Sequence, residues 1–71
     1  MSISQQLIKF LSARPFRPFT VELDNDTAYA IATSEHASVL RTILVIEDDT
    51  GAADLVAISH ITRLRVAAEN L

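Results

Sequence analysis

The amino-acid sequence predicts a mainly β domain, in which one N-terminal α-helix precedes five short strands of a small, bent antiparallel sheet or barrel. Three observations predict this. Apolar residues repeat at helical spacing near the N-terminus and with a period of two afterwards. Turn residues recur roughly every eight to twelve positions. The chain has 71 residues, 49% of them apolar, with one Gly and two Pro, which is typical of one packed domain over residues 1–71.

The N-terminal segment has the pattern of a helix over about residues 3–13. Ser2, followed three residues later by Gln5, forms a capping-box pattern at its start. Pro15 disfavours helical geometry at the preceding residue and so ends the helix. One face of this helix is apolar at the spacing i, i+4, i+7, i+8, through Ile3, Leu7, Phe10 and Leu11.

A stiff proline connector over residues 14–18 separates the helix from the strands. We expect Phe16 or Phe19 to anchor the helix against the strands. A short helical turn capped by Ser34 interrupts the strand pattern. The strands are predicted at about residues 19–24, 27–33, 39–47, 53–59 and 62–67.

The third predicted strand contains four contiguous apolar residues, so both of its faces are apolar there. Such a run implies a strand covered on both sides, by the helix, by sheet curvature or by a neighbouring subunit. Ten of the apolar residues are Ala, so large core-forming side chains are scarce for a chain of this size. We therefore expect a homo-oligomer, whose interface includes Ile43, Leu44, Val45 and Ile46.

The charge is unevenly distributed. The formal net charge is -3, but residues 1–20 carry +3 and the remaining residues carry -6. Residues 1–20, here called the basic arm, have three cations, Lys9, Arg14 and Arg17. Together with Phe16 and Phe19, these cations form a combination that can bind single-stranded RNA. The residue pattern favours another interpretation, in which the aromatic rings are core and the arginines bond helix-end carbonyls or the acidic body.

Few residues are suited to catalysis, and the chain has no cysteine. Ser34, Glu35, His36 and Ser38 are packed into one turn, where nucleophile, base and orienting group cannot lie in a line, so a solvated turn is the favoured interpretation. His60 with Asp54 or His36 lacks metal-ligand spacing. We expect His60 to make a structural hydrogen bond; pH sensing at a subunit interface is the alternative.

An acidic group surrounds the turn that ends in Gly51, through Glu47, Asp48, Asp49 and Asp54. It lacks the ligand spacing of a calcium loop, so a solubilising hairpin tip is favoured. The sequence therefore predicts a protein that is not an enzyme, with no catalytic residue, metal ligand or cofactor. No secretory signal pattern or membrane-length apolar run is present, and we expect a cytoplasmic protein without membrane contact.

The chain resembles a group of short bacterial proteins of unknown function that share a Phe-Arg-Pro-Phe connector. The residues that carry this resemblance are Phe16–Phe19, Tyr29–Ile31 before Ser34-Glu35, the turn Asp48–Gly51, and Ile61–Leu64. More distantly, it is similar to the Sm-like, or SH3-like, small-barrel fold and its Hfq-type branch of bacterial RNA chaperones. That resemblance rests on the element order, on Leu23–Asp26 and on Ala57–Ser59.

The RNA-chaperone pattern differs at three places. This chain has Asp26 where that family has Gly, Leu55-Val56 where it has the Lys-His pair of its uridine-binding pore, and Glu22 where it commonly has an aromatic residue. The resemblance therefore implies architecture rather than that RNA site. We expect a self-associating interaction module, with a protein partner open and an Sm-like RNA-binding ring using the basic arm as the alternative.

Overall fold

The computed structural model describes residues 2–66, beginning with helix α1, Ile3–Ser12. The predicted capping box is confirmed: the Ser2 hydroxyl accepts from the Gln5 N–H at 3.2 Å, and the Gln5 side chain accepts from the Ser2 N–H at 3.2 Å. Ala13, before the cis Arg14–Pro15 peptide, is already extended. The Ser2 side chain therefore satisfies a backbone N–H group in the first turn of the helix, and the helix ends where the proline connector begins.

The first sheet has the strand order β2-β1-β6 and is antiparallel throughout. Its strands are β1, Phe19–Leu23; β2, Ala28–Ile31; and β6, Ile61–Val66. In the β1–β2 turn, Asp26 has a φ of 66° and the Asn25 side chain accepts from the Thr27 N–H at 3.1 Å. These are the turn properties for which Asn and Asp are suited.

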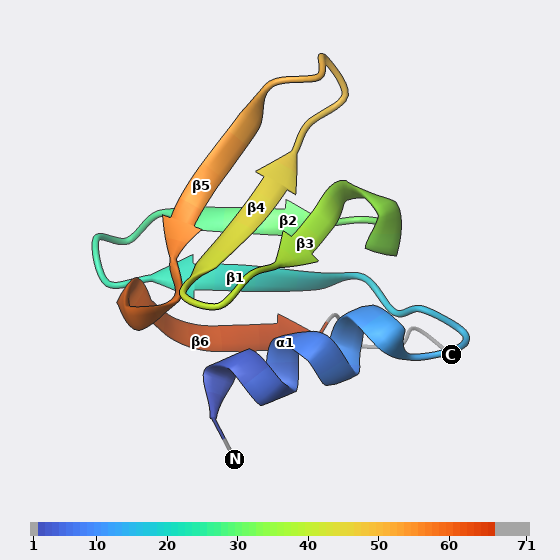
Figure 1. Ribbon diagram of the computed structural model, residues 1–71, viewed down its shortest axis with the longest axis horizontal. Helices are drawn as coiled ribbons and strands as arrows, with labels where there is room; N and C mark the ends of the chain where they lie inside the picture. The colour runs from blue at the N-terminus through green and yellow to red at the C-terminus, as the bar shows by residue number, and fades with distance from the viewer. Residues whose placement is uncertain (1, 67–71) are drawn as a thin grey trace.

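The second sheet has the order β3-β4-β5 and is also antiparallel. Its strands are β3, Ala37–Val39; β4, Ile43–Glu47; and β5, Ala53–Ala57. A tight turn joins β3 to β4, since the Leu40 N–H donates to the Ile43 carbonyl at 2.8 Å. The β4–β5 hairpin turns at Gly51, whose φ of 89° lies in the left-handed region. Figure 1 shows this hairpin extending away from the first sheet.

The expectation of a mainly β fold with one helix is confirmed, but the prediction of five strands in one sheet or barrel is wrong. Residues 2–66 contain six strands in two separate three-stranded sheets that do not close into a barrel. The predicted 39–47 strand is two strands, because a turn at Arg41 and Thr42, which contains neither Gly nor Pro, separates Val39 from Ile43.

The remaining differences arise at two 3₁₀ turns. The predicted 27–33 strand stops at Ile31, and the turn η1, Ser34–His36, separates it from β3; Thr33 rather than Ser34 occupies its cap position. The predicted 53–59 strand stops at Ala57, where η2, Ile58–His60, leads into β6. Ala67, the last residue of the predicted fifth strand, lies outside the described residues.

The core lies between the two sheets and α1 (Figure 1). The Phe19 ring, 2% exposed, meets Phe10 of the helix edge-on at a centroid distance of 5.2 Å and meets Phe16 at 6.1 Å. The expected aromatic anchor between helix and sheet is therefore present. The buried side chains of the described residues are Leu7, Phe19, Val21, Ile31, Leu44, Ile46, Val56 and Ile61.

Leu44 is fully buried, so Leu44→Ala should lower the free energy of unfolding by about 2–5 kcal/mol through lost transfer energy and the remaining cavity. Urea unfolding at one fixed protein concentration measures this. Leu40, 54% exposed, provides the matched control, and Leu40→Ala should change the free energy by roughly 0.5 kcal/mol or less. Equal effects of the two substitutions would contradict the assignment of the core.

Candidate interaction site

Strand β5 is an edge strand that presents a large apolar side chain to solvent. Leu55 is 71% exposed, and its cross-strand neighbour Val45 is half-buried on the same outer face, beside Ile43. Of the four residues predicted at an interface, Leu44 and Ile46 point the other way and are buried in the chain's own core. The structure thus divides the apolar run, leaving Ile43 and Val45 available on the outer face.

The free backbone groups of β5 can be assigned from its hydrogen bonds to β4. The Ile58 N–H donates to the Thr42 carbonyl at 3.0 Å, and the Asp48 N–H donates to the Ala52 carbonyl at 2.9 Å. Bonded and non-bonded pairs alternate along an antiparallel ladder. The backbone groups of the odd-numbered residues Ala53, Leu55 and Ala57 therefore point away from β4, toward the open edge.

Strand β6 is the edge of the first sheet, and its free groups can be assigned in the same way. The Leu23 N–H donates to the Thr27 carbonyl at 2.9 Å, so odd-numbered residues of β1 bond β2 and even-numbered ones bond β6. Leu64 and Val66, which pair with odd-numbered β1 residues, direct their backbone groups outward. The Val66 side chain is 39% exposed and Leu64 is half-buried. β6 is therefore a second sheet edge, whose Leu64 packs against the chain's own core and whose Val66 borders the hollow next to α1.

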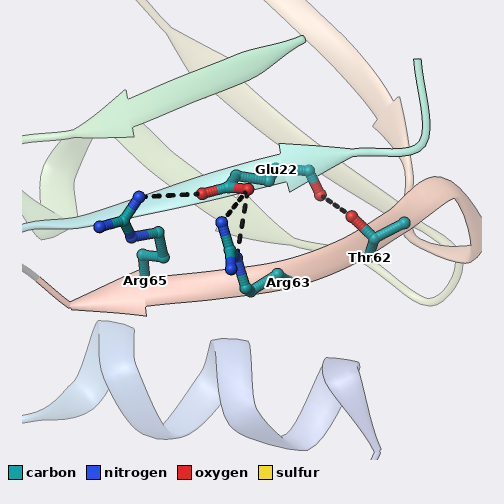
Figure 2. A network of polar contacts seen from close by, with 4 residues as sticks. All are labelled: Glu22, Thr62, Arg63 and Arg65. Atoms are coloured by element: carbon teal, nitrogen blue, oxygen red, sulfur yellow. Dashed lines mark hydrogen bonds and ion pairs between the residues drawn. The ribbon is translucent and has the colours of Figure 1, made fainter. Parts of the chain in front are cut away.

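The outer face of the first sheet carries an ion-pair network centred on Glu22 (Figure 2). The Arg63 Nε and Nη2 atoms donate to Glu22 Oε1 at 3.2 and 2.8 Å, and the Thr62 hydroxyl donates to the Glu22 carbonyl at 3.2 Å. Arg65 Nη1 lies 3.9 Å from Glu22 Oε2, beyond ordinary hydrogen-bond distance. Arg63 therefore makes the short bonds to Glu22, whereas Arg65, whose side chain is 67% exposed, forms a longer ion pair with the same carboxylate.

The structure separates the three cations of the predicted basic arm. Lys9 and Arg17 line one apolar hollow of about 220 Å³ together with Phe10, Ala13 and Val66. Arg14 turns instead to the helix end, where its Nη1 donates to the Ala13 carbonyl at 2.8 Å and the Leu11 carbonyl at 3.4 Å. Lys9 and Arg17 are thus brought together, and Arg14 makes the helix-end bonds that the sequence favoured.

His60 pairs with Asp24, a residue that sequence reasoning did not connect with it. The His60 Nδ1 lies 2.9 Å from Asp24 Oδ2, and the Asp24 N–H donates to the His60 carbonyl at 3.0 Å. The expected structural hydrogen bond is thus present, though its partner is neither Asp54 nor His36. The two residues are 36 positions apart, and only the pairing of β1 with β6 brings them together.

A hollow of about 410 Å³ opens beside this pair, between the two sheets. Tyr29 and Asn25 of the first sheet and its turn line it together with Leu55 and Val56 of the second sheet. The side chains of His60 and Asp24 are 61% and 52% exposed, so water screens the pair and limits its contribution to stability.

The Ser34-Glu35-His36 turn makes a local contact. The His36 Nδ1 lies 2.9 Å from the Thr33 hydroxyl at the start of η1. Glu35, His36 and Ser38 border a shallow hollow next to Val45. This arrangement is that of a surface turn whose histidine ring is fixed by its neighbour.

The acidic tip of the β4–β5 hairpin is organised by one carboxylate. Asp48 Oδ1 accepts from the Thr50 hydroxyl at 2.6 Å and from the N–H groups of Thr50 and Ala52 at 2.9 and 3.1 Å. These donors, above all the Thr50 hydroxyl, hold the pKa of Asp48 below its ordinary value of 3.8. Within residues 2–66 no cluster of three or more His, Cys, Asp or Glu side chains has the arrangement of a metal site.

Removing the Thr50 hydroxyl should raise the pKa of Asp48 toward its ordinary value, because the charged carboxylate loses its strongest hydrogen-bond donor. NMR titration of the Asp48 carboxyl carbon in Thr50→Val measures the shift. Thr62→Val, which removes a hydroxyl from the other sheet, is the control. A titration midpoint for Asp48 that stays unchanged in Thr50→Val would contradict the role of the hydroxyl.

Comparisons of the chain with protein-family models, with curated proteins and with solved structures gave no match. Among the described residues, none of the helices combines the length and apolar character needed to cross a membrane.

Proposed function

We propose that this protein is a non-enzymatic, self-associating interaction module, in which strand β5 of one copy pairs with strand β6 of the next. The observation that carries the proposal is the open β5 edge with Leu55 71% exposed on it. Exposed edge strands of monomeric proteins are usually blunted by proline, lysine or a bulge. The β5 sequence, Ala-Asp-Leu-Val-Ala, has no proline or lysine; its one charge, Asp54, lies on the inward face, where it protects the edge against partners that lack a cation.

The side chains of the two edges support this pairing. The backbone groups that point to the open edge belong to odd-numbered residues on β5 and to even-numbered residues on β6. When two residues bond directly across an antiparallel ladder, their side chains lie on the same face of the sheet. Leu55 of one copy would then lie on the same face as Leu64 and Val66 of the second copy. Leu55 and Val66 are exposed and would lose contact with water on pairing, whereas Leu64 already packs against the chain's own core.

Pairing of two different edges is a heterologous contact, which closes into a ring or continues as a filament. As part of this proposal, the element order supports a distant likeness to Sm-like domains: a helix first, then short antiparallel strands, with Ala57–Ser59 running into η2 before the last strand. The small core supports it as well, since assembly adds buried area that the chain alone lacks.

Single-stranded RNA is the second candidate partner, and one observation favours it. Lys9 and Arg17 lie beside the Phe10 ring on the same hollow, which is a combination of cations and aromatic surface suited to phosphates and bases. In this alternative the basic hollow, rather than the β5 edge, is the functional surface.

Ala57→Pro should abolish self-association while leaving the folded chain intact. The Ala57 φ of -66° is already that of proline, and its N–H points to the open edge rather than to β4. Proline therefore removes a donor only from the intermolecular ladder. Sedimentation velocity over a range of protein concentrations measures the change, with circular dichroism as the test of folding.

Leu55→Thr is the complementary variant, because it keeps a strand-forming residue but removes the exposed leucine side chain; it should weaken association. Leu40→Thr, at an exposed leucine outside both edges, is the matched control and should leave association unchanged. A wild-type chain that remains monomeric at high micromolar concentration would overturn the proposal.

The RNA alternative predicts that Lys9→Glu with Arg17→Glu abolishes binding of A-rich or U-rich RNA, and that binding weakens steeply as salt rises. Arg14→Glu is the control, since Arg14 does not line the hollow that Lys9 and Arg17 border, and it should have the smaller effect. Fluorescence anisotropy with labelled oligonucleotides at low salt measures all three variants. Undetectable binding by the wild-type chain would remove this alternative.

A further inference from the structure

We infer that Asp54 on β5 and Arg65 on β6 form an intermolecular ion pair that sets the register of assembly and selects β6 as the partner edge. This inference rests on the proposed pairing of β5 with β6. It concerns a different property of that contact, namely which residues face one another and which wrong pairings are rejected. The partner that binds at the β5 edge is a second copy of this chain.

The register follows from the lengths of the strands and their outward groups. β5 has five residues and β6 has six. Bonding Leu55 to Leu64 aligns all five β5 residues with residues 62–66 of the second copy. Ala53 then lies opposite Val66, and Asp54 lies directly opposite Arg65. Bonding Leu55 to Thr62 instead would carry Ala57 past the start of β6 at Ile61, into η2.

The two charged side chains would then project from the same face. Asp54 pairs with buried Ile46 within its own sheet, and so lies on the face opposite Leu55. Arg65 pairs with Thr20 and lies on the outer face with Glu22. Because directly opposite residues of a ladder share one face, the Asp54 carboxylate and the Arg65 guanidinium would be cross-strand neighbours, at a Cβ separation of about 4.5–5.5 Å.

Arg65 is suited to accept this partner. Its guanidinium lies 3.9 Å from the nearest Glu22 oxygen, while Arg63 makes the short bonds to that carboxylate (Figure 2). Arg65 is 67% exposed, and a guanidinium carries five N–H donors. Asp54 is exposed and is the only charged residue of β5. The two edges therefore carry complementary charges at positions that the register brings together.

Charge reversal tests the pair. Asp54→Lys places two cations opposite each other and Arg65→Glu places two anions, so each variant alone should associate roughly 2- to 30-fold more weakly. The double variant Asp54→Lys/Arg65→Glu restores an opposite pair and should recover most of the affinity. An equimolar mixture of the two single variants should also associate, since every contact between unlike copies is attractive. Sedimentation velocity measures each case.

Arg41→Glu and Asp49→Lys change the net charge by the same amounts away from both edges, and should leave association unchanged. Circular dichroism and thermal unfolding of every variant separate misfolding from weaker association; a folding defect of Arg65→Glu would persist in the double variant. Rescue of Asp54→Lys by Arg63→Glu instead of Arg65→Glu would overturn the register. Association that is abolished by Ala57→Pro but insensitive to every charge reversal would overturn this ion pair while leaving the proposed function standing.

Discussion

The shared burial of a few side chains between two small sheets is the constraint on which the rest of this structure depends. Neither three-stranded sheet has a second layer of its own, so Val21 and Ile31 from one sheet and Leu44 and Val56 from the other must face a common interior. Helix α1 covers the remaining opening with Leu7. Because side chains alternate along a strand, this choice of inward residues also decides which residues face outward.

The same alternation of side chains decides which residues lie on the outer faces of the two sheets. With Leu44 and Val56 inside, Leu55 and Val45 must point outside, although they are as apolar as their neighbours. With Val21 inside, Glu22 and Arg63 must lie on the outer face, where they form an ion pair. The exposed leucine and the ion-pair network are therefore results of one register, and a slip of one residue would exchange core and surface on every strand.

Much of the fold could be predicted from the sequence because it depends on local signals. The capping box at Ser2 and the Asn-containing turn after β1 are interactions between residues two or three positions apart. What depends on strand pairing could not be predicted. The two-residue turn at Arg41 and Thr42 contains neither Gly nor Pro, and no spacing rule connects His60 with Asp24. The basic arm was likewise one feature in the sequence, but in space Arg14 turns away from Lys9 and Arg17.

The charge pattern of the two edges explains why one pairing would be preferred to the others. Two copies of β6 paired about Leu64 would place Arg63 opposite Arg65 twice, a repulsive arrangement. Two copies of β5 would leave the Asp54 carboxylate opposite Val56 or opposite another Asp54, without a cation. Of these three pairings, β5 with β6 alone places Asp54 opposite an arginine while also joining Leu55 to Leu64. In the proposed assembly, the apolar side chains would favour association in general, and Asp54 on one edge and the arginines on the other would select this pairing among the three.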